Sequence, residues 1–109
     1  MTFTDSFLRM RDKTVAVDID GTICTEERTF ERPLATPLPG AVEALQLLKK
    51  NGNTIILWTG RGWEQFKVTK RWLDDHGCVY DQLLMGKPIV NVFIDDRARH
   101  FTGWDNVEI

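Results

Sequence analysis

Four short apolar segments, each followed directly by a polar residue or a glycine, constrain the fold of this chain more than any other feature. They are Thr14–Val17, Thr54–Trp58, Gln82–Met85 and Asn91–Ile94. Nearly continuous apolar runs bounded by turn residues are typical of strands buried on both faces, as in parallel sheets. We therefore predict four strands in one parallel sheet.

Two helical patterns separate the first three strands. The first follows Pro39-Gly40 and ends at the basic residues and glycine of positions 49–52. The second covers residues 63–76 and ends at Gly77, because glycine readily closes a helix. Its expected stripe consists of Phe66, Lys70 and Leu73. Alternating strands and helices predict an α/β fold, a three-layer α/β/α sandwich around a central parallel sheet with right-handed crossovers.

With 109 residues and 42% hydrophobic content, the chain is long enough for one domain over 1–109 with a real core. Residues 1–13 form an N-terminal extension and residues 23–39 a flap region. We also expect a short helix or turn within 97–104 and a terminal edge strand at 106–109.

The formal net charge of −2 does not support nucleic-acid binding through bulk electrostatics. Cys24 and Cys78 lie far apart without metal-site spacing, so we expect no zinc, and unpaired thiols fit a reducing compartment. We find no signal-peptide pattern and no apolar stretch long enough to span a membrane. The expected location is therefore cytoplasmic.

Each predicted strand ends in a residue that is capable of chemistry. These residues are Asp18 and Asp20, Thr59, Lys87, and Asp95 and Asp96. The carboxyl ends of parallel strands lie along one edge of a sheet, and ligands bind where the strand order reverses. If the first strand is central and the fourth is its neighbour, the two acidic pairs face each other there.

An acidic cluster of this kind needs a cation, and carboxylate oxygens suit Mg²⁺ better than a soft metal. Together with Lys87 and the Thr59 hydroxyl, it forms a set suited to phosphoryl transfer. Asp18, at the end of its strand, can attack phosphorus. Asp20 lies on the same side, one step outward, where it can act as general acid and then as base. Gly21 permits the sharp turn that follows.

The chain resembles the haloacid dehalogenase-like hydrolase superfamily in its phosphatase branch, over about residues 14–97. The family's first motif matches Asp18-Ile19-Asp20-Gly21-Thr22, and its second matches Thr59 in "LWTGRG". The third matches Lys87 in "GKP", and the fourth matches Asp95-Asp96 in "FIDDR". The resemblance implies a Rossmann-like haloacid dehalogenase core.

It also implies an aspartyl-phosphate on Asp18, with Asp20 as acid/base and Thr59 and Lys87 completing the catalytic set. The Mg²⁺ ligands would be the Asp18 side chain, the Asp20 carbonyl and Asp95, with Asp96 as direct or water-mediated helper. Which of the adjacent acids touches the metal stays open. The assigned substrate contacts are Gly21, Thr22, Gly60 and Arg61, with a structural ion pair as the alternative for Arg61.

Family members usually carry a cap domain, and here neither gap between motifs is long enough for one. The chain therefore looks like a capless member, similar to small phosphatases linked to surface-polysaccharide synthesis and, more loosely, to the phosphatase domain of polynucleotide kinases. The expected substrate is a phosphomonoester: a sugar phosphate, a nucleotide or a 3′-phosphorylated polynucleotide end. The alternatives are a receiver-like phospho-acceptor domain, and a phosphotransferase or mutase that uses the same aspartate.

An uncapped site needs a roof, which a large substrate or a second subunit can supply. We therefore predict a homo-oligomer formed through the N-terminal apolar residues Phe3, Phe7, Leu8 and Met10. Several further side chains are predicted individually. We expect Trp58, Trp72 and Trp104 in the core, Trp63 as a core or half-buried helix anchor, a buried inert thiol at Cys24, and His76 at its helix C-terminus.

Overall fold

Three parallel strands form the sheet of this molecule, for which the computed structural model describes all residues, 1–109. They are β1 (Thr14–Asp18), β2 (Thr54–Trp58) and β3 (Gln82–Leu84), in the order β1-β2-β3. The α-helices are α1 (Asp5–Arg9), α2 (Ala41–Lys50) and α3 (Phe66–Asp75). The 3-10 helices are η1 (Thr29–Leu34), η2 (Trp63–Gln65) and η3 (Trp104–Asn106). The predicted α/β class and the first three strands are confirmed.

The two predicted helices form within their expected ranges, and the second begins with the short turn η2. The buried residues of α3 are Thr69, Trp72 and Leu73, so the predicted stripe was right for Leu73 and wrong for Lys70. Lys70 is exposed and pairs with Asp74 one turn later, at 2.6 Å. A long lysine side chain on a helix surface gains more from such a pair and from water than from burial.

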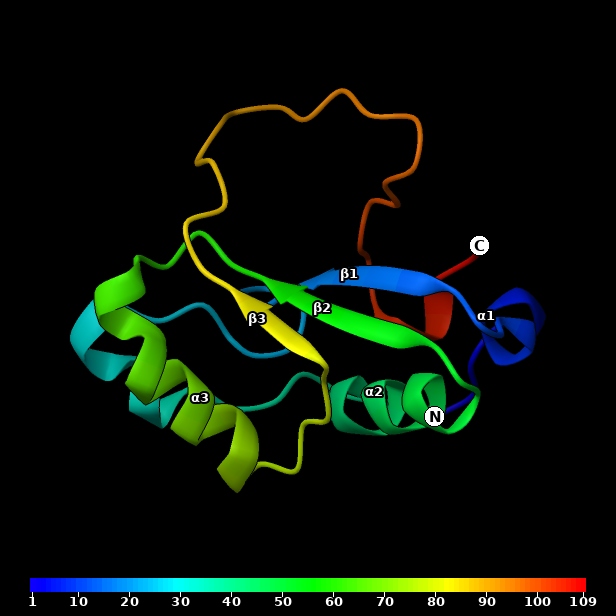
Figure 1. Cartoon of the computed structure of the whole chain (residues 1–109), viewed down its shortest axis with the longest axis horizontal. Helices are drawn as coiled ribbons and strands as arrows, with labels where there is room; N and C mark the ends of the chain where they lie inside the picture. Colours follow the sequence, from blue (N-terminus) through cyan, green and yellow to red (C-terminus); the bar gives the residue numbers. More distant parts are fainter.

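Both long helices lie on the same side of the sheet, and a loop of residues 86–103 arches over the other side (Figure 1). This arrangement follows from the strand order, because right-handed crossovers that step in one direction place every helix on one face. A helix layer on the other face would need a strand beyond β1, where the order reverses. The predicted three-layer sandwich is therefore not formed in this structure.

The prediction of a fourth strand over residues 91–94 was wrong. The segment forms no ladder, β1 stays an edge strand, and Ile94 is 98% exposed. Phe93 packs instead against Trp58, with ring centroids 6.4 Å apart. An apolar pattern indicates that a segment can form a strand, but it does not specify which edge the segment pairs with. Here a side-chain contact on the open face replaces the ladder.

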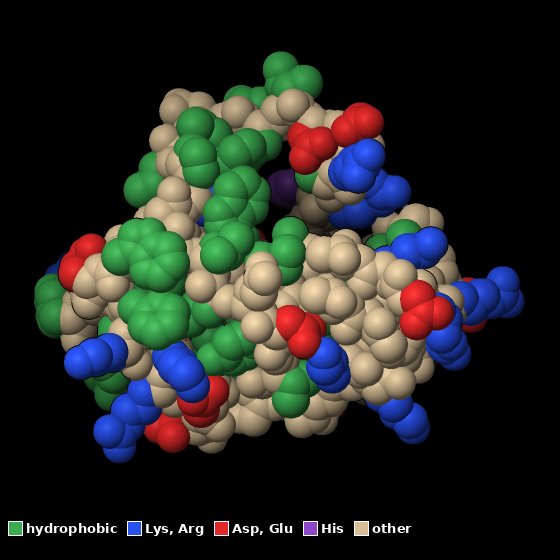
Figure 2. All heavy atoms as spheres, in the orientation of Figure 1, with side chains coloured by type: hydrophobic (Ala, Val, Ile, Leu, Met, Phe, Trp, Pro, Cys, Tyr) green, Lys and Arg blue, Asp and Glu red, His purple; other side chains and the backbone are tan.

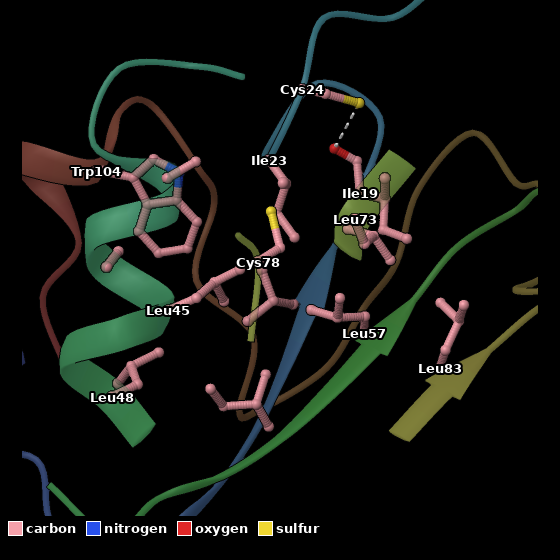
Figure 3. Packing of buried hydrophobic residues seen from close by; sticks show 14 of the residues in the cluster. Ile19, Ile23, Cys24, Leu45, Leu48, Leu57, Leu73, Cys78, Leu83 and Trp104 are labelled. Carbon is pink, nitrogen blue, oxygen red and sulfur yellow. Dashed lines mark hydrogen bonds between the residues drawn. The ribbon is translucent and has the colours of Figure 1, made fainter. Parts of the chain in front are cut away.

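The core lies between the sheet and the helices α2 and α3. Residues of the covered sheet face alternate with those of the open face, so Val17, Leu57 and Leu83 are buried while Ala16 and Leu84 are exposed. Figure 3 shows residues of this core, drawn from the strands, both long helices and the turn after β1. The site residues at the strand ends therefore rest on a packed layer.

The N-terminal segment belongs to this core rather than to a separate extension. Phe7 on α1 is 2% exposed and Met10 is 8% exposed. Phe7 packs against Phe3 and Trp104, with ring centroids 5.1 and 6.2 Å apart. The predicted edge strand at 106–109 is absent, because this end of the chain forms η3 and joins α1 by side-chain and backbone hydrogen bonds. Residues 1–13, predicted as an extension, therefore contribute Phe7 and Met10 to the core.

The flap region over residues 23–39 is attached to the fold at both ends. Cys24 pairs with Pro37 in an isolated antiparallel bridge. Its central 3-10 helix η1 contacts α3, and the Trp72 indole N–H donates to the Ala35 carbonyl at 2.9 Å. The region is therefore held against α3.

Candidate functional site

The carboxyl end of β1 carries Asp18 and Asp20 on either side of Ile19, which is 1% exposed. The Ile19 carbonyl accepts the N–H groups of Thr22, Ile23 and Cys24 at 2.8–3.2 Å, which forms a tight turn directly after the strand. Gly21 lies in this turn with φ = 82°, a left-handed conformation that glycine adopts without strain. The buried isoleucine and the turn together explain why the acids alternate at this point of the sequence.

Asp18 is paired with Lys87, the lysine that follows β3. Its Oδ1 lies 3.7 Å from the Lys87 Nζ. Burial raises the pKa of the Asp18 carboxyl above its usual value, and Lys87 opposes that shift, because a nearby cation favours the ionised form. The Lys87 ammonium also lies 5.2 Å from the ring centroid of Trp58 and 5.1 Å from that of Phe93. These two aromatic faces hold the lysine beside the carboxylate.

Backbone hydrogen bonds continue past the strand ends and bring the loops after β2 and β3 together. The Thr59 N–H donates to the Leu84 carbonyl at 3.0 Å, and the Lys87 N–H donates to the Thr59 carbonyl at 2.8 Å. The Gly86 N–H donates to the Arg61 carbonyl at 2.8 Å. Thr59 and Lys87 are therefore placed by the same ladder extension, as the parallel topology predicts.

Asp20 is held by Arg61 and Thr59 from the end of β2. The Arg61 Nε donates to Asp20 Oδ2 at 3.0 Å, and Nη2 donates to Oδ1 at 2.7 Å, which forms a bidentate pair. The Thr59 hydroxyl donates to Asp20 Oδ2 at 3.5 Å and accepts the Arg61 backbone N–H at 3.1 Å. For Arg61, the structure contains the ion pair that sequence analysis left as the alternative to substrate contact.

The predicted ligands of a metal ion are only partly gathered. Asp95 and Asp96 lie on the exposed loop, where Asp95 accepts the Arg97 N–H at 3.0 Å. No group of three or more histidine, cysteine or acidic side chains is arranged to hold a metal ion. The four acids predicted to serve Mg²⁺ therefore do not fit that ion in this arrangement of the chain, because the loop keeps two of them away from β1.

The predicted substrate contacts Gly21, Thr22 and Gly60 all lie in the turns at the strand ends. The Thr22 carbonyl accepts the Trp104 indole N–H at 2.8 Å, which ties this turn to the C-terminal part of the chain. A Cβ added at Gly60 would lie 3.4 Å from the Ile89 side chain and 3.6 Å from the Lys87 carbonyl. Glycine here lets the loop after β3 approach closely.

Sequence analysis missed Thr69, which accepts the third guanidinium hydrogen bond of Arg61 at 3.0 Å from α3. A polar residue on a helix face eight positions after an arginine was the available signal. Cys24 is buried as predicted, with Sγ 3.9 Å from Asp20 Oδ1. Burial raises the pKa of its thiol to about 12, so the cysteine is inert at neutral pH.

Aromatic residues near the site differ in burial. Trp72 and Trp104 are buried as predicted, Trp58 is half-buried, and Trp63 is 61% exposed, which corrects its predicted role as an anchor. Trp63 stacks on Phe66 with ring centroids 5.9 Å apart. Its ring therefore contacts a residue of the adjoining helix α3 and does not enter the core. Figure 2 shows apolar side chains gathered over the helix start and the arching loop. His76 lies at the C-terminus of α3 as predicted, with Nδ1 2.8 Å from the Trp72 carbonyl.

A hollow of about 400 Å³ lies between the N-terminus and the segment before η3. Its walls include Met1, Pro39, Phe101 and Trp104, and none of the predicted site residues lines it. Within the polar cluster at the strand ends, Asp18, Asp20 and Lys87 are half-buried, whereas Thr59 and Arg61 are buried. No helix of the structure combines the length and the apolar character needed to cross a membrane.

Comparison with protein-family models and with curated proteins gives no match, whereas solved structures do match. A structural-genomics target from Vibrio cholerae is 25% identical with a TM-score of 0.74, over 89% of this chain and 90% of that one. A chain of the Pnkp1/Rnl/Hen1 complex is 25% identical with a TM-score of 0.62, over 81% of this chain. A chain of the Pnkp1/Rnl/Hen1 RNA repair complex is 26% identical with a TM-score of 0.62, over 69% of this chain. This chain spans 32% and 26% of the length of those two chains.

Proposed function

We propose that this protein is a phosphatase of the haloacid dehalogenase-like type, which hydrolyses a phosphomonoester through an aspartyl-phosphate on Asp18. The observation that carries the proposal is the meeting of Asp18 with Lys87, 3.7 Å apart, and of Asp20 with Thr59, 3.5 Å apart, at the carboxyl ends of three parallel strands. These residues come from three separate stretches of the sequence. Their common place at one sheet edge is the arrangement that such a reaction needs.

In the proposed first step, an Asp18 oxygen attacks phosphorus while the bond from phosphorus to the leaving oxygen breaks. Asp20 donates its proton to that oxygen as it departs. In the second step Asp20 takes a proton from water, the water oxygen attacks phosphorus, and the bond from phosphorus to Asp18 breaks to release phosphate. Lys87 counters the negative charge of the phosphate. The general acid–base catalysis by Asp20 typically contributes ~10²–10⁴-fold to the rate.

The resemblance also implies Mg²⁺, and the acids do not fit it until the loop moves. We propose that residues 91–94 pair with the free edge of β1 in the active form, which would bring Asp95 and Asp96 to the end of that strand. The apolar side chains of this segment are exposed, Val92 at 71%, Phe93 at 51% and Ile94 at 98%. Burying apolar surface favours such pairing at roughly 25 cal/mol per Å². The resulting sheet would have strands on both sides of β1 and the predicted haloacid dehalogenase core.

The substrate class follows from what the site offers. No cap covers it and the predicted contacts are backbone turns, so a sugar phosphate, a nucleotide and a polynucleotide end are all accommodated. Because two of the similar chains belong to the Pnkp1/Rnl/Hen1 complex, described as an RNA repair complex, we include 3′-phosphorylated oligonucleotides among the proposed substrates. A screen of such oligonucleotides beside phosphorylated metabolites, with Mg²⁺ present, separates these classes.

The proposal is tested with Asp18→Asn on an aryl phosphate. We expect hydrolysis by the wild type with Mg²⁺ and none above background by Asp18→Asn, because a neutral amide is too weak a nucleophile to form the acyl phosphate. Asp75→Asn removes the same charge from an exposed position of α3 and should keep full activity. Activity of Asp18→Asn at the wild-type level would overturn the proposal. A phosphorylated protein that accumulates without turnover would instead favour the phospho-acceptor alternative.

A further inference from the structure

Arg61 is the most completely engaged charged residue of the molecule, with 4% of its surface exposed. Its guanidinium donates two hydrogen bonds to Asp20 and one to the Thr69 hydroxyl, at 2.7–3.0 Å, and a long one to Cys24 Sγ at 3.8 Å. Its backbone N–H and carbonyl are bonded as well, to the Thr59 hydroxyl and the Gly86 N–H. The residue therefore connects the ends of all three strands with α3.

The partners of this guanidinium decide what it can do. A buried arginine needs a paired carboxylate and further acceptors for its remaining N–H groups. Thr69 supplies the acceptor and is 1% exposed, and Asp20 supplies the carboxylate, of which 19% of the side chain is exposed. The pair thus leaves the arginine enclosed and the aspartate accessible. A phosphate in solution would reach Asp20 before it reached the guanidinium.

The bidentate geometry fixes the plane of the Asp20 carboxylate, because a planar fork tolerates little rotation of the group that it binds. Asp20 Oδ2 also accepts the Thr59 hydroxyl at 3.5 Å, whereas the only other contact of Oδ1 is the long one to Cys24 Sγ at 3.9 Å, so Oδ1 offers the lone pair that can take a proton. A proton can therefore enter and leave Asp20 while the pair stays in place. Thr69 in turn fixes the guanidinium, since its hydroxyl accepts from Nη1, the nitrogen that Asp20 does not bind.

We propose that Arg61 is a positioning residue for the acid/base Asp20, and that Thr69 on α3 holds Arg61 in place for this task. The inference rests on the proposed function, in which Asp20 protonates the leaving oxygen. It changes the expected role of Arg61 from substrate contact to orientation of a catalytic group. It also gives α3 a part in the chemistry, through one buried hydroxyl.

The experiment compares two substrates that differ in their need for an acid. Alkyl phosphates have poor leaving groups and need protonation, whereas nitrophenyl phosphate does not. For Thr69→Val and Arg61→Lys we expect kcat to fall further on the alkyl than on the aryl substrate, with KM little changed. The loss should lie below the loss in Asp20→Asn, for which ~10²–10⁴-fold is typical of a missing acid. Thr69→Ser keeps the hydroxyl and should restore the wild-type ratio.

Three kinetic results would overturn the inference. A raised KM with unchanged kcat in Arg61→Lys would make the arginine a substrate contact. Equal losses on both substrates would show a purely structural role, as would full recovery of activity at a temperature where the variant is folded.

A measurement without substrate separates this inference from the proposed function. The Arg61 Nε–H should exchange slowly with solvent in the wild type and in Thr69→Ser, faster in Thr69→Val, and fastest in Asp20→Asn. Rapid exchange in the wild type would contradict the positioning geometry itself. Absence of hydrolysis in the wild type, with slow exchange retained, would contradict the proposed function and the catalytic role of the pair.

Discussion

At the scale of single residues, Asp18 combines its proposed catalytic role with a cost to stability. Burial raises the pKa of its carboxyl more than Lys87 lowers it. In the unfolded chain the pKa of this carboxyl is about 3.9. The folded state therefore holds a proton on Asp18 at pH values where the unfolded chain has lost it. Stability falls as the pH rises from the unfolded to the folded pKa, because over this interval the folded state binds more protons.

We therefore predict that Asp18→Asn unfolds at a higher temperature than the wild type at pH 7, although it is inactive. The gain should vanish at pH values below the unfolded pKa, where the wild-type carboxyl is protonated in both states. Thermal unfolding followed by circular dichroism at several pH values measures it. Asp75→Asn, on the exposed part of α3, serves as the control and should show no such pattern. A variant less stable than the wild type at pH 7 would show that the Lys87 pair outweighs burial.

The residue scale also shows which parts of the site were readable from sequence. The alternation of Asp18 and Asp20 and the left-handed turn at Gly21 follow from neighbours in the chain, so the local pattern was sufficient. The bonds from Arg61 to Asp20 and Thr69 join three segments. Whether a guanidinium turns toward substrate or toward a carboxylate depends on tertiary packing, which no local pattern contains.

At the scale of elements, β1 is an edge strand that can still pair with a further strand. The Thr54 N–H donates to the Lys13 carbonyl, so in a parallel ladder the alternate residues Thr14, Ala16 and Asp18 direct their backbone groups away from β2. No strand lies on that side. These free groups are the ones that the proposed pairing with residues 91–94 would bond.

We expect Mg²⁺ to slow amide exchange at Ala16, as measured by NMR, because the ion would draw Asp95 and Asp96 to β1 and hold the paired segment. The Ile55 amide, which already donates to Asp81 at 2.7 Å, should not change and provides the internal control. The double variant Asp95→Asn, Asp96→Asn should lose the effect of Mg²⁺. Unchanged exchange at Ala16 under saturating Mg²⁺, with hydrolysis present, would mean that the proposed activity does not need a strand beyond β1.

Sequence reasoning at this scale succeeded where helix and strand alternate closely. Crossovers through α2 and α3 place β2 beside β1 and β3 beside β2, and right-handedness leaves few choices. The fourth segment has no such constraint, because a loop with Pro88 and several exposed apolar residues connects it to β3. The apolar pattern of this segment predicts a strand. The pattern does not specify whether the segment pairs with the edge of β1 or packs through Phe93 on Trp58.

At the scale of the whole molecule, the two ends of the chain close the core together. The Thr4 side chain accepts the Phe7 N–H at the start of α1 and bonds the Val107 carbonyl. The Asn53 side chain, 1% exposed, accepts the Lys13 N–H and donates to the Met10 carbonyl, both at 3.0 Å. The sequence held no sign of these links, since they join residues up to 103 positions apart. The N-terminal segment thus contributes to the core of the folded monomer, and the homo-oligomer stays a prediction.

This assignment makes a clear prediction for Phe7→Ala. Removing a phenylalanine that is 2% exposed leaves a cavity between α1 and Trp104 and typically costs about 3–5 kcal/mol of unfolding free energy. Urea unfolding should therefore show a large loss for Phe7→Ala. Leu8→Ala is the matched control, because Leu8 is 39% exposed on the same helix and its truncation should cost far less. Light scattering on the same samples distinguishes the alternative: if Phe7 served a contact between subunits, Phe7→Ala would lower the molecular mass at little cost to the unfolding of the monomer. We expect the opposite, an unchanged mass for the folded protein and a folded state that a much lower urea concentration disrupts, because the ring packs inside one molecule.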